Sequence, residues 1–189
     1  QSAAAKAGKA LDASAVERVN AGFQLGFHAI GDKGVQMALD AFDAAQTSAH
    51  SKRTKAQDGT ANYRLRIEHA QVTNPLQVAR FRELNVIASM QPCHLLTDMR
   101  WAEARLGPGR AAHSYAWAEF ARRGVPLAFG TDYPVEPVTP FRGLYAAVTR
   151  KSEDGKQEYY PEEKLTIEQA IAAYTTGSAY AEFAEKDKG

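Results

Sequence analysis

Two kinds of hydrophobic spacing alternate along the chain. Between 23 and 28, large apolar residues alternate with small or polar ones, and this period of two predicts a strand that ends at His28. From 35 to 42 the apolar residues recur at helical spacing, which predicts a helix. The polar segment from 46 to 62 predicts a solvated loop. The first unit is therefore a strand followed by a helix and a loop.

The same order of strand and helix repeats three more times. Strands are predicted at 64–68, 86–90 and 126–130; the first of them runs into His69, and the last is followed closely by Asp132. Helices are predicted at 14–22, 75–84, 114–123, 141–150 and 166–174. Capping signals open three of these helices: Ser14-x-x-Glu17, Asn74-Pro75 and Thr166-x-x-Gln169. An irregular stretch is expected after the third strand.

Strands that alternate with helices favour an α/β fold, with parallel strands and helices packed outside them. Four such units account for half of a (β/α)8 TIM barrel, whose usual length is about 250 residues. Because a half barrel exposes strand edges on both sides of its sheet, we expect the chain to be incomplete or to be completed by a partner. A small open sheet, complete at this length, is the alternative.

Composition narrows the class of partner. The 189 residues include 23 basic and 22 acidic ones, and a net charge of +1 offers no electrostatic footprint for nucleic acid or an anionic membrane. No apolar run approaches the ~20 residues that span a bilayer, and the first ten residues lack the apolar stretch of a signal peptide. Cys93 is the single cysteine of the sequence, so His, Asp and Glu are the available metal ligands. We expect a small-molecule partner.

Three predicted strands end in residues that can bind metal: His28, His69 and Asp132. Barrels of this kind carry their chemistry at the carboxyl ends of the strands. Two imidazoles and one carboxylate suit zinc and leave a position for water, whose pKa the metal lowers to about 7. Taken singly, each histidine is more readily explained as a residue hydrogen-bonded to backbone, and the Gly-Thr-Asp turn as a loop cap. Their shared topological position favours a metal site.

Several motifs together resemble one known family. They are GFHAIGD at 26–32, RIEHAQ at 66–71, QPCHLLTD at 91–98 followed by Trp101, GTDYPVEPVTPFRGLYAAVTR at 130–150 and AIAAYTTGSAYAEF at 170–183. The set covers nearly the whole chain and resembles the amidohydrolase superfamily, in the YtcJ-like branch (amidohydrolase family 3) that includes N-substituted formamide deformylase. The resemblance implies a barrel with one or two divalent metal ions, usually zinc, and hydroxide that attacks a carbonyl carbon.

The resemblance also implies roles for the three residues at the strand ends. His28 and His69 would be metal ligands from the fifth and sixth strands of the barrel. Asp132 would be the aspartate of the eighth strand, which binds metal and acts as the catalytic general base that passes a proton from water to the leaving amine. Its carboxylate must be ionised for this role.

Three further residues would face the substrate. His94, in the loop after the seventh strand, would contact the substrate and polarise its carbonyl; a solvated loop histidine is the alternative. Asp98 and Trp101 would shape the pocket.

The chain departs from the family pattern in what it lacks. The first metal site of the family needs a His-x-His pair and a carboxylated Lys or a Glu, and no His-x-His occurs in these 189 residues. The β-sandwich of the family is missing too. We therefore interpret residues 1–189 as the C-terminal half of an amidohydrolase TIM barrel, about strands 5 to 8. The remainder of the barrel is the expected partner, and a homo-oligomer is a further one.

These expectations define a function for the whole protein. It is predicted to be a metal-dependent enzyme that hydrolyses carbon-nitrogen bonds of non-peptide amides, while this chain alone is expected to be inactive. The alternative is a non-catalytic, barrel-derived binding or scaffold protein. We expect a cytoplasmic location, with the periplasm as the alternative.

Overall fold

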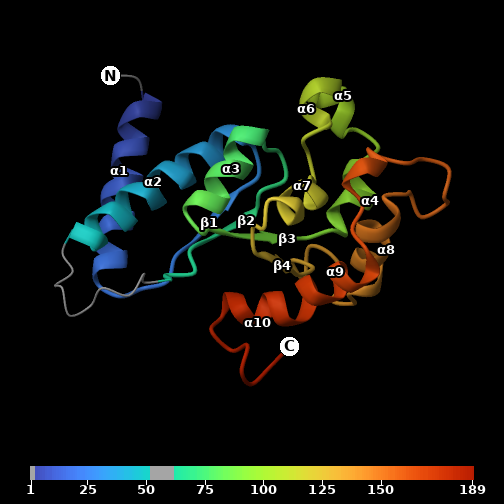
Figure 1. Ribbon diagram of the computed structural model, residues 1–189. Coiled ribbons are helices and arrows are strands. Elements are labelled where there is room, and N and C mark those ends of the chain that lie inside the picture. The colour runs from blue at the N-terminus through green and yellow to red at the C-terminus, as the bar shows by residue number, and fades with distance from the viewer. Residues whose placement is uncertain (1–2, 52–61) are drawn as a thin grey trace.

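Four parallel strands form the sheet. The computed structural model describes residues 3–51 and 62–189 (Figure 1). The strands are β1 (Gly26–Ala29), β2 (Arg66–His69), β3 (Ile87–Met90) and β4 (Leu127–Phe129), and they lie in the order β1-β2-β3-β4. Every predicted strand is present, although each is shorter than predicted. The sheet confirms the α/β class with parallel strands, whereas the partial barrel stays a prediction.

Helices follow each strand. They are α1 (Ala3–Asn20), α2 (Asp32–Ser51), α3 (Pro75–Glu83), α4 (His94–Asp98), α5 (Ala102–Leu106), α6 (Pro108–Ala111), α7 (Trp117–Arg122), α8 (Phe141–Thr149), α9 (Ile167–Ala172) and α10 (Ser178–Ala181), with a π-helical turn η3 (Ala173–Gly177) before α10. After the third strand the stretch 91–101 was predicted to be irregular, and this prediction is wrong, because His94–Asp98 forms a short helix. In Figure 1, α1, α2 and α3 lie together on one side of the sheet and α10 lies on the other. Within the described ranges, no helix is both long and apolar enough to cross a bilayer.

The N-terminal helix is longer than predicted. Because α1 begins at Ala3, Ser14 lies inside the helix instead of at its start, and its hydroxyl accepts a hydrogen bond from Arg18 at 2.5 Å. Alanine has the highest helix propensity, which explains why the alanine-rich stretch upstream is helical. Helix α2 also continues past the predicted start of the loop and ends at Ser51. The rest of that predicted loop, 52–61, lies outside the described residues.

The other two capping signals are confirmed. Asn74 accepts a hydrogen bond from the backbone N–H of Gln77 at 3.0 Å, and the Gln77 side chain accepts one from the Asn74 N–H at 3.2 Å. Thr166 and Gln169 make the same reciprocal pair at the start of α9. Such a pair satisfies two of the free N–H groups at a helix start. These contacts therefore fix where α3 and α9 begin.

The two faces of the sheet differ in chemistry. One row of residues in register is Phe27, Ile67, Ala88 and Leu127, and the next row along the strands is His28, Glu68, Ser89 and Ala128. Successive residues of a strand point to opposite faces, so the apolar row and the mostly polar or small row lie on different sides. The apolar row packs on the helices, where Phe27 stacks against Phe42 of α2 with ring centroids 4.8 Å apart. The second face carries His28.

The two edges of the sheet are not alike. Among the described residues, β1 has a partner strand on one side only. At the other edge, the hydroxyl of Ser178 donates a hydrogen bond to the carbonyl of Phe129 in β4 at 2.9 Å. A Cβ on Gly177 would lie 2.2 Å from the carbonyl oxygen of Leu127, so only glycine fits between η3 and β4. The C-terminal helices therefore cover part of the β4 edge.

Candidate metal centre

The carboxyl ends of the strands open into one cavity of about 620 Å³. It is lined by all six residues that the sequence predicted for the site: His28, His69, His94, Asp98, Trp101 and Asp132. The fold brings them together because the strands are parallel, so the residues that follow each strand meet at the same edge of the sheet. Whether each side chain has its predicted role stays a prediction.

Three of these side chains are placed to hold a metal ion. One ligand atom each from His69, His94 and Asp132 lies within 4.8 Å of the others. Nε2 of His94 is 3.8 Å from Oδ2 of Asp132. His28 adjoins this group, with its ring edge-on to that of His69 and the two centroids 4.3 Å apart. The sequence grouped His28 with His69 and Asp132, and the structure adds His94 to the same cluster.

The backbone at the end of β2 explains how His69 reaches this cluster. Glu68 lies on the same face as His28, so ideal alternation would direct His69 to the opposite face. The strand geometry breaks at this point, since His69 has a φ of 73° and Ala70 a φ of 46°. Positive φ is uncommon outside glycine and is often found at functional sites. The left-handed turn is consistent with the edge-on contact between His69 and His28.

The chemistry of the cluster fits a divalent cation. Among the residues that the structure describes, Nδ1 of His69 and Nε2 of His94 are buried and have no hydrogen-bond partner. An unpaired buried polar group costs about 1–3 kcal/mol, a cost that coordination would remove. Burial lowers the pKa of His69, which favours the neutral imidazole that metals bind. Two imidazole nitrogens and a carboxylate oxygen are a donor set that zinc accepts.

A second group of polar side chains lines another part of the cavity. The Tyr115 hydroxyl donates a hydrogen bond to Oδ2 of Asp98. The Gln71 amide donates to the Tyr115 hydroxyl at 2.6 Å and to the same Asp98 oxygen at 3.3 Å. Burial raises the pKa of Tyr115, so its hydroxyl stays protonated and acts as the donor. The Tyr115 N–H donates to the Gln71 carbonyl at 2.7 Å, which fixes the two segments together.

Two further charged residues of the cavity wall have partners of opposite charge. Arg110 lies 3.1 Å from Asp32, at the start of α2. Glu136 lies 2.9 Å from Arg142 of α8 and also accepts a hydrogen bond from Thr97 at 3.0 Å. Opposite charges at these distances neutralise each other locally. Neither side chain therefore presents an uncompensated charge to the cavity.

Sequence reasoning missed several residues of this wall, among them Gln71, Tyr115 and Glu136. Gln71 and Glu136 lie within the motifs RIEHAQ and GTDYPVEP, close behind His69 and Asp132, and this proximity was an available signal. Tyr115 gave no such signal, because it lies in a segment predicted to be helical. The helix begins only at Trp117, since Tyr115 has a φ of 52°.

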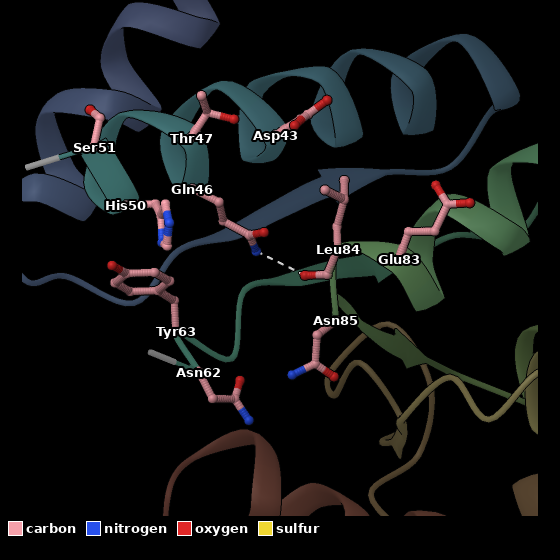
Figure 2. Close-up of a pocket in the computed structure, with 10 residues that line it drawn as sticks. All are labelled: Asp43, Gln46, Thr47, His50, Ser51, Asn62, Tyr63, Glu83, Leu84 and Asn85. Atoms are coloured by element: carbon pink, nitrogen blue, oxygen red, sulfur yellow. Dashed lines mark hydrogen bonds between the residues drawn. The ribbon is translucent and has the colours of Figure 1, made fainter. Parts of the chain in front are cut away.

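A second cavity, of about 670 Å³, lies at the opposite end of the sheet. Figure 2 shows its lining from the end of α2, the segments that precede β2 and β3, and the hydrogen bond from the Gln46 amide to the Leu84 carbonyl. His50 is its one described histidine. Since barrel-type folds place their chemistry at the carboxyl ends of strands, the cavity around His69 is the better candidate site.

A parallel sheet with imidazoles and a carboxylate gathered at the carboxyl ends of its strands defines an α/β protein with a candidate metal centre. The sequence profile of the amidohydrolase family matches residues 5–189, and this chain belongs to that family. The family resemblance that the motifs predicted is therefore confirmed.

Curated relatives match most of this chain but only part of their own length. Protein LONG AFTER FAR-RED 3 of Arabidopsis thaliana is 34% identical over 169 residues, which cover 89% of this chain and 27% of that protein. Putative amidohydrolase YtcJ of Bacillus subtilis (strain 168) is 32% identical over 170 residues, 89% of this chain and 30% of that protein. N-substituted formamide deformylase of Arthrobacter pascens is 24% identical over 180 residues, 93% of this chain and 30% of that protein. The chain thus spans less than a third of each.

Two crystal structures share the fold. An uncharacterized metal-dependent hydrolase from Pyrococcus furiosus superposes with a TM-score of 0.74 at 33% identity, covering 94% of this chain and 34% of that one. An uncharacterized metal-dependent hydrolase from Pyrococcus horikoshii OT3 gives a TM-score of 0.73 at 32% identity, covering 89% and 31%. Both likenesses extend over nearly all of this chain.

Proposed function

We propose that the protein that carries this chain is a metal-dependent hydrolase of carbon-nitrogen bonds in non-peptide amides. The observation that carries the proposal is the cluster of His69, His94 and Asp132, whose ligand atoms lie within 4.8 Å of one another. Two of the imidazole nitrogens are buried without a described hydrogen-bond partner. Family membership and the two metal-dependent hydrolases of similar fold support the same conclusion.

The chain is proposed to form half of a (β/α)8 barrel, equivalent to about strands 5 to 8. Four parallel strands in sequential order, each followed by helices, are what half of such a barrel requires. The chain also covers only 34% and 31% of the two solved structures that share its fold. The rest of the barrel would supply the remaining strands, and with them the N-terminal ligands that this sequence lacks.

His28, His69 and Asp132 are the proposed metal ligands, and zinc is the proposed metal. Two imidazole nitrogens and one carboxylate oxygen are a ligand set of known catalytic zinc sites. A divalent metal supplies Lewis acidity, which polarises a carbonyl and makes water a nucleophile near neutral pH. His94 lies close enough to Asp132 to serve either as a ligand or as a contact to the substrate carbonyl.

Asp132 is the proposed general base. Its side chain is 38% exposed at the cavity, so a carboxylate oxygen can reach water and substrate together. In this role it takes a proton from the attacking water and gives it to the amine nitrogen as the carbon-nitrogen bond breaks. The apolar part of the wall, which includes Val72, Trp101 and Leu106, would hold the body of the amide and exclude water.

The test uses the full-length gene product and an N-substituted formamide, N-benzylformamide, as the probe. We expect bound divalent metal and metal-dependent release of formate and benzylamine. Asp132→Asn should abolish turnover, whereas His113→Gln, at an exposed histidine that does not line the cavity, should keep it. Protein that binds no metal and does not hydrolyse the probe would count against the proposal and for a binding or scaffold protein. Hydrolysis that survives Asp132→Asn would count against Asp132 as the general base.

The isolated chain is proposed to be inactive. One edge of β1 has no partner among the described strands, and the cavity is walled by this half of the barrel alone. Hydrolysis by residues 1–189 alone, at a rate that follows metal occupancy, would contradict this part of the proposal.

A further inference from the structure

The charges that line the metal cavity leave one carboxylate uncompensated. Three acidic residues line it: Asp98, Asp132 and Glu136. Glu136 is paired with Arg142, and Asp132 belongs to the metal cluster. Among the described residues, Asp98 has no ion-pair partner, and its ligand atoms are not part of that cluster. Asp98 therefore brings a negative charge to the cavity that no described cation matches.

The hydrogen bonds to Asp98 also hold the carboxylate in one orientation. The Tyr115 hydroxyl and the Gln71 amide both donate to Oδ2. Within the described part of the chain, Oδ1 has no such donor. Tyr115 and Gln71 are themselves buried and tied together through their backbones. The carboxylate is thus preorganised by neutral donors, with one oxygen left for a ligand, as a recognition group should be.

An aromatic ring lies in the same wall. Trp101 lines the cavity and is 49% exposed as a residue, and its backbone N–H donates to the Asp98 carbonyl at 3.0 Å. An exposed indole face attracts cations, because the ring carries negative charge above its plane. A carboxylate and an indole that open into one cavity form a pair of groups that together favour a positively charged nitrogen.

We propose that Asp98 and Trp101 form a cation-recognition subsite, and that the substrate of this protein is an amide that carries an ammonium-type nitrogen on the side remote from the reacting bond. The inference rests on the proposed hydrolytic function and names its substrate class. Asp98 binds the cation through Oδ1, and the Trp101 ring covers the cation. Tyr115 and Gln71 hold Asp98 in position. The apolar lining around Val72 and Leu106 contacts the hydrocarbon between the cation and the amide.

The test compares two formamides of equal size on the metal-loaded full-length protein. One is N-[4-(aminomethyl)benzyl]formamide, which is cationic, and the other is its neutral 4-hydroxymethyl analogue. We expect the cationic formamide to have the higher kcat/KM by about 10- to 100-fold, the usual worth of a charge-assisted hydrogen bond. Asp98→Asn should lower kcat/KM for the cationic formamide by a larger factor than for the neutral analogue and so remove the preference, because the Asn oxygen can still accept from Tyr115 but carries no charge.

Matched controls separate the subsite from a general effect of charge. Glu103→Gln removes a negative charge from the neighbouring helix α5, outside the cavity lining, and should leave the preference intact. Trp101→Leu should lower kcat/KM for the cationic formamide more than for the neutral analogue, and so reduce the preference. Equal kcat/KM for the two formamides, or equal losses for both in Asp98→Asn, would overturn the proposal.

A binding measurement keeps the subsite testable apart from hydrolysis. Benzyltrimethylammonium cannot ligate a metal, and calorimetry should show it binding at least tenfold more tightly than benzyl alcohol, with the difference lost in Asp98→Asn. Binding of this kind without turnover of either formamide would sink the proposed function and keep the subsite. Turnover of both formamides without any preference for the cation would support the proposed function and overturn the subsite.

Discussion

Nε2 of His94 lies 3.8 Å from Oδ2 of Asp132, although the two residues follow different strands, β3 and β4. The contact brings an imidazole that the sequence assigned to the substrate next to a carboxylate that it assigned to the metal. His28, the third predicted ligand, instead touches His69. The positions of these side chains therefore make His28, His69 and His94 all candidate metal ligands.

The metal content of two single variants distinguishes a metal ligand from a substrate contact. If His28 is a ligand and His94 a substrate contact, His28→Asn should lower the bound metal per chain, whereas His94→Asn should retain it. In the second variant kcat for N-benzylformamide should fall by about 10²–10³, the usual cost of removing a group that stabilises charge in the transition state. Elemental analysis of the dialysed full-length protein gives the metal content. Loss of metal from His94→Asn would make His94 a ligand instead.

The buried Arg150 is expected to be a large single contributor to stability. Its Nε donates to the Tyr159 carbonyl at 2.6 Å and one terminal nitrogen donates to the Tyr115 carbonyl at 2.7 Å, while its guanidinium lies over Trp117. Arg150→Met should lower the free energy of unfolding by about 1–3 kcal/mol, because it leaves the Tyr159 carbonyl without its donor and the Tyr115 carbonyl with the Trp117 N–H alone. Urea unfolding measures the change. Lys151→Met, at the exposed neighbour, is the control and should change it by less than about 0.5 kcal/mol.

An ion pair between Arg64 and Glu185, 2.5 Å apart, joins the segment that precedes β2 to the C-terminal segment. The hydrogen bond from Arg64 lowers the pKa of Glu185 to about 2, below the usual value of 4.5. The pair therefore stabilises the folded protein fully above pH 4.5, and this contribution is lost as the pH falls from 4.5 towards 2.

Thermal unfolding as a function of pH should show this window. Glu185→Gln should have a lower Tm than the unmodified protein at pH 7, and the two curves should converge below pH 4.5. Glu182→Gln breaks the more exposed contact to Lys188 and should leave the Tm nearly unchanged. A difference for Glu185→Gln that persists undiminished at pH 3 would show that the side chain acts through packing instead of charge.

Helix α8 packs closely on Tyr174 at Gly143. A Cβ at this glycine would lie 1.8 Å from the Tyr174 hydroxyl oxygen and 2.8 Å from Cζ. Gly143→Ala should therefore destabilise the protein by about 1–3 kcal/mol through overpacking, despite the gain in helix propensity. Combining it with Tyr174→Leu should cost less than the sum of the two single changes. Gly109→Ala, where a Cβ meets open space, is the control and should be neutral or stabilising.

Much of the fold follows from local patterns. The period-two stretch before His28 and the helical spacing after Gly31 are properties of neighbouring residues, so β1 and α2 could be predicted without tertiary information. The ends of the strands at His69 and near Asp132 could be predicted from the same local pattern. Helix α1 was predicted too short, because a capping box signals a start only when the preceding residues are not helical themselves.

The contacts within the site depend on the tertiary fold and could not be predicted in this way. Asp98, Gln71 and Tyr115 come from three separate segments, and their hydrogen bonds exist only once α4 and the Tyr115 segment have packed. The left-handed turn at His69 is equally absent from the strand pattern, which predicts simple alternation. Sequence reasoning therefore identified which residues gather at the strand ends but not which of them touch.

The hydrogen bond between Ser178 and the Phe129 carbonyl makes the two ends of the sheet unequal as templates for backbone pairing. A further strand can add to β1 directly, whereas at β4 it must first displace the serine hydroxyl. Fragment complementation, in which this chain is co-expressed with the proposed other half of the barrel, should therefore nucleate at β1 and complete closure at β4. The slower step would be the release of α10, and Ser178→Ala would accelerate it.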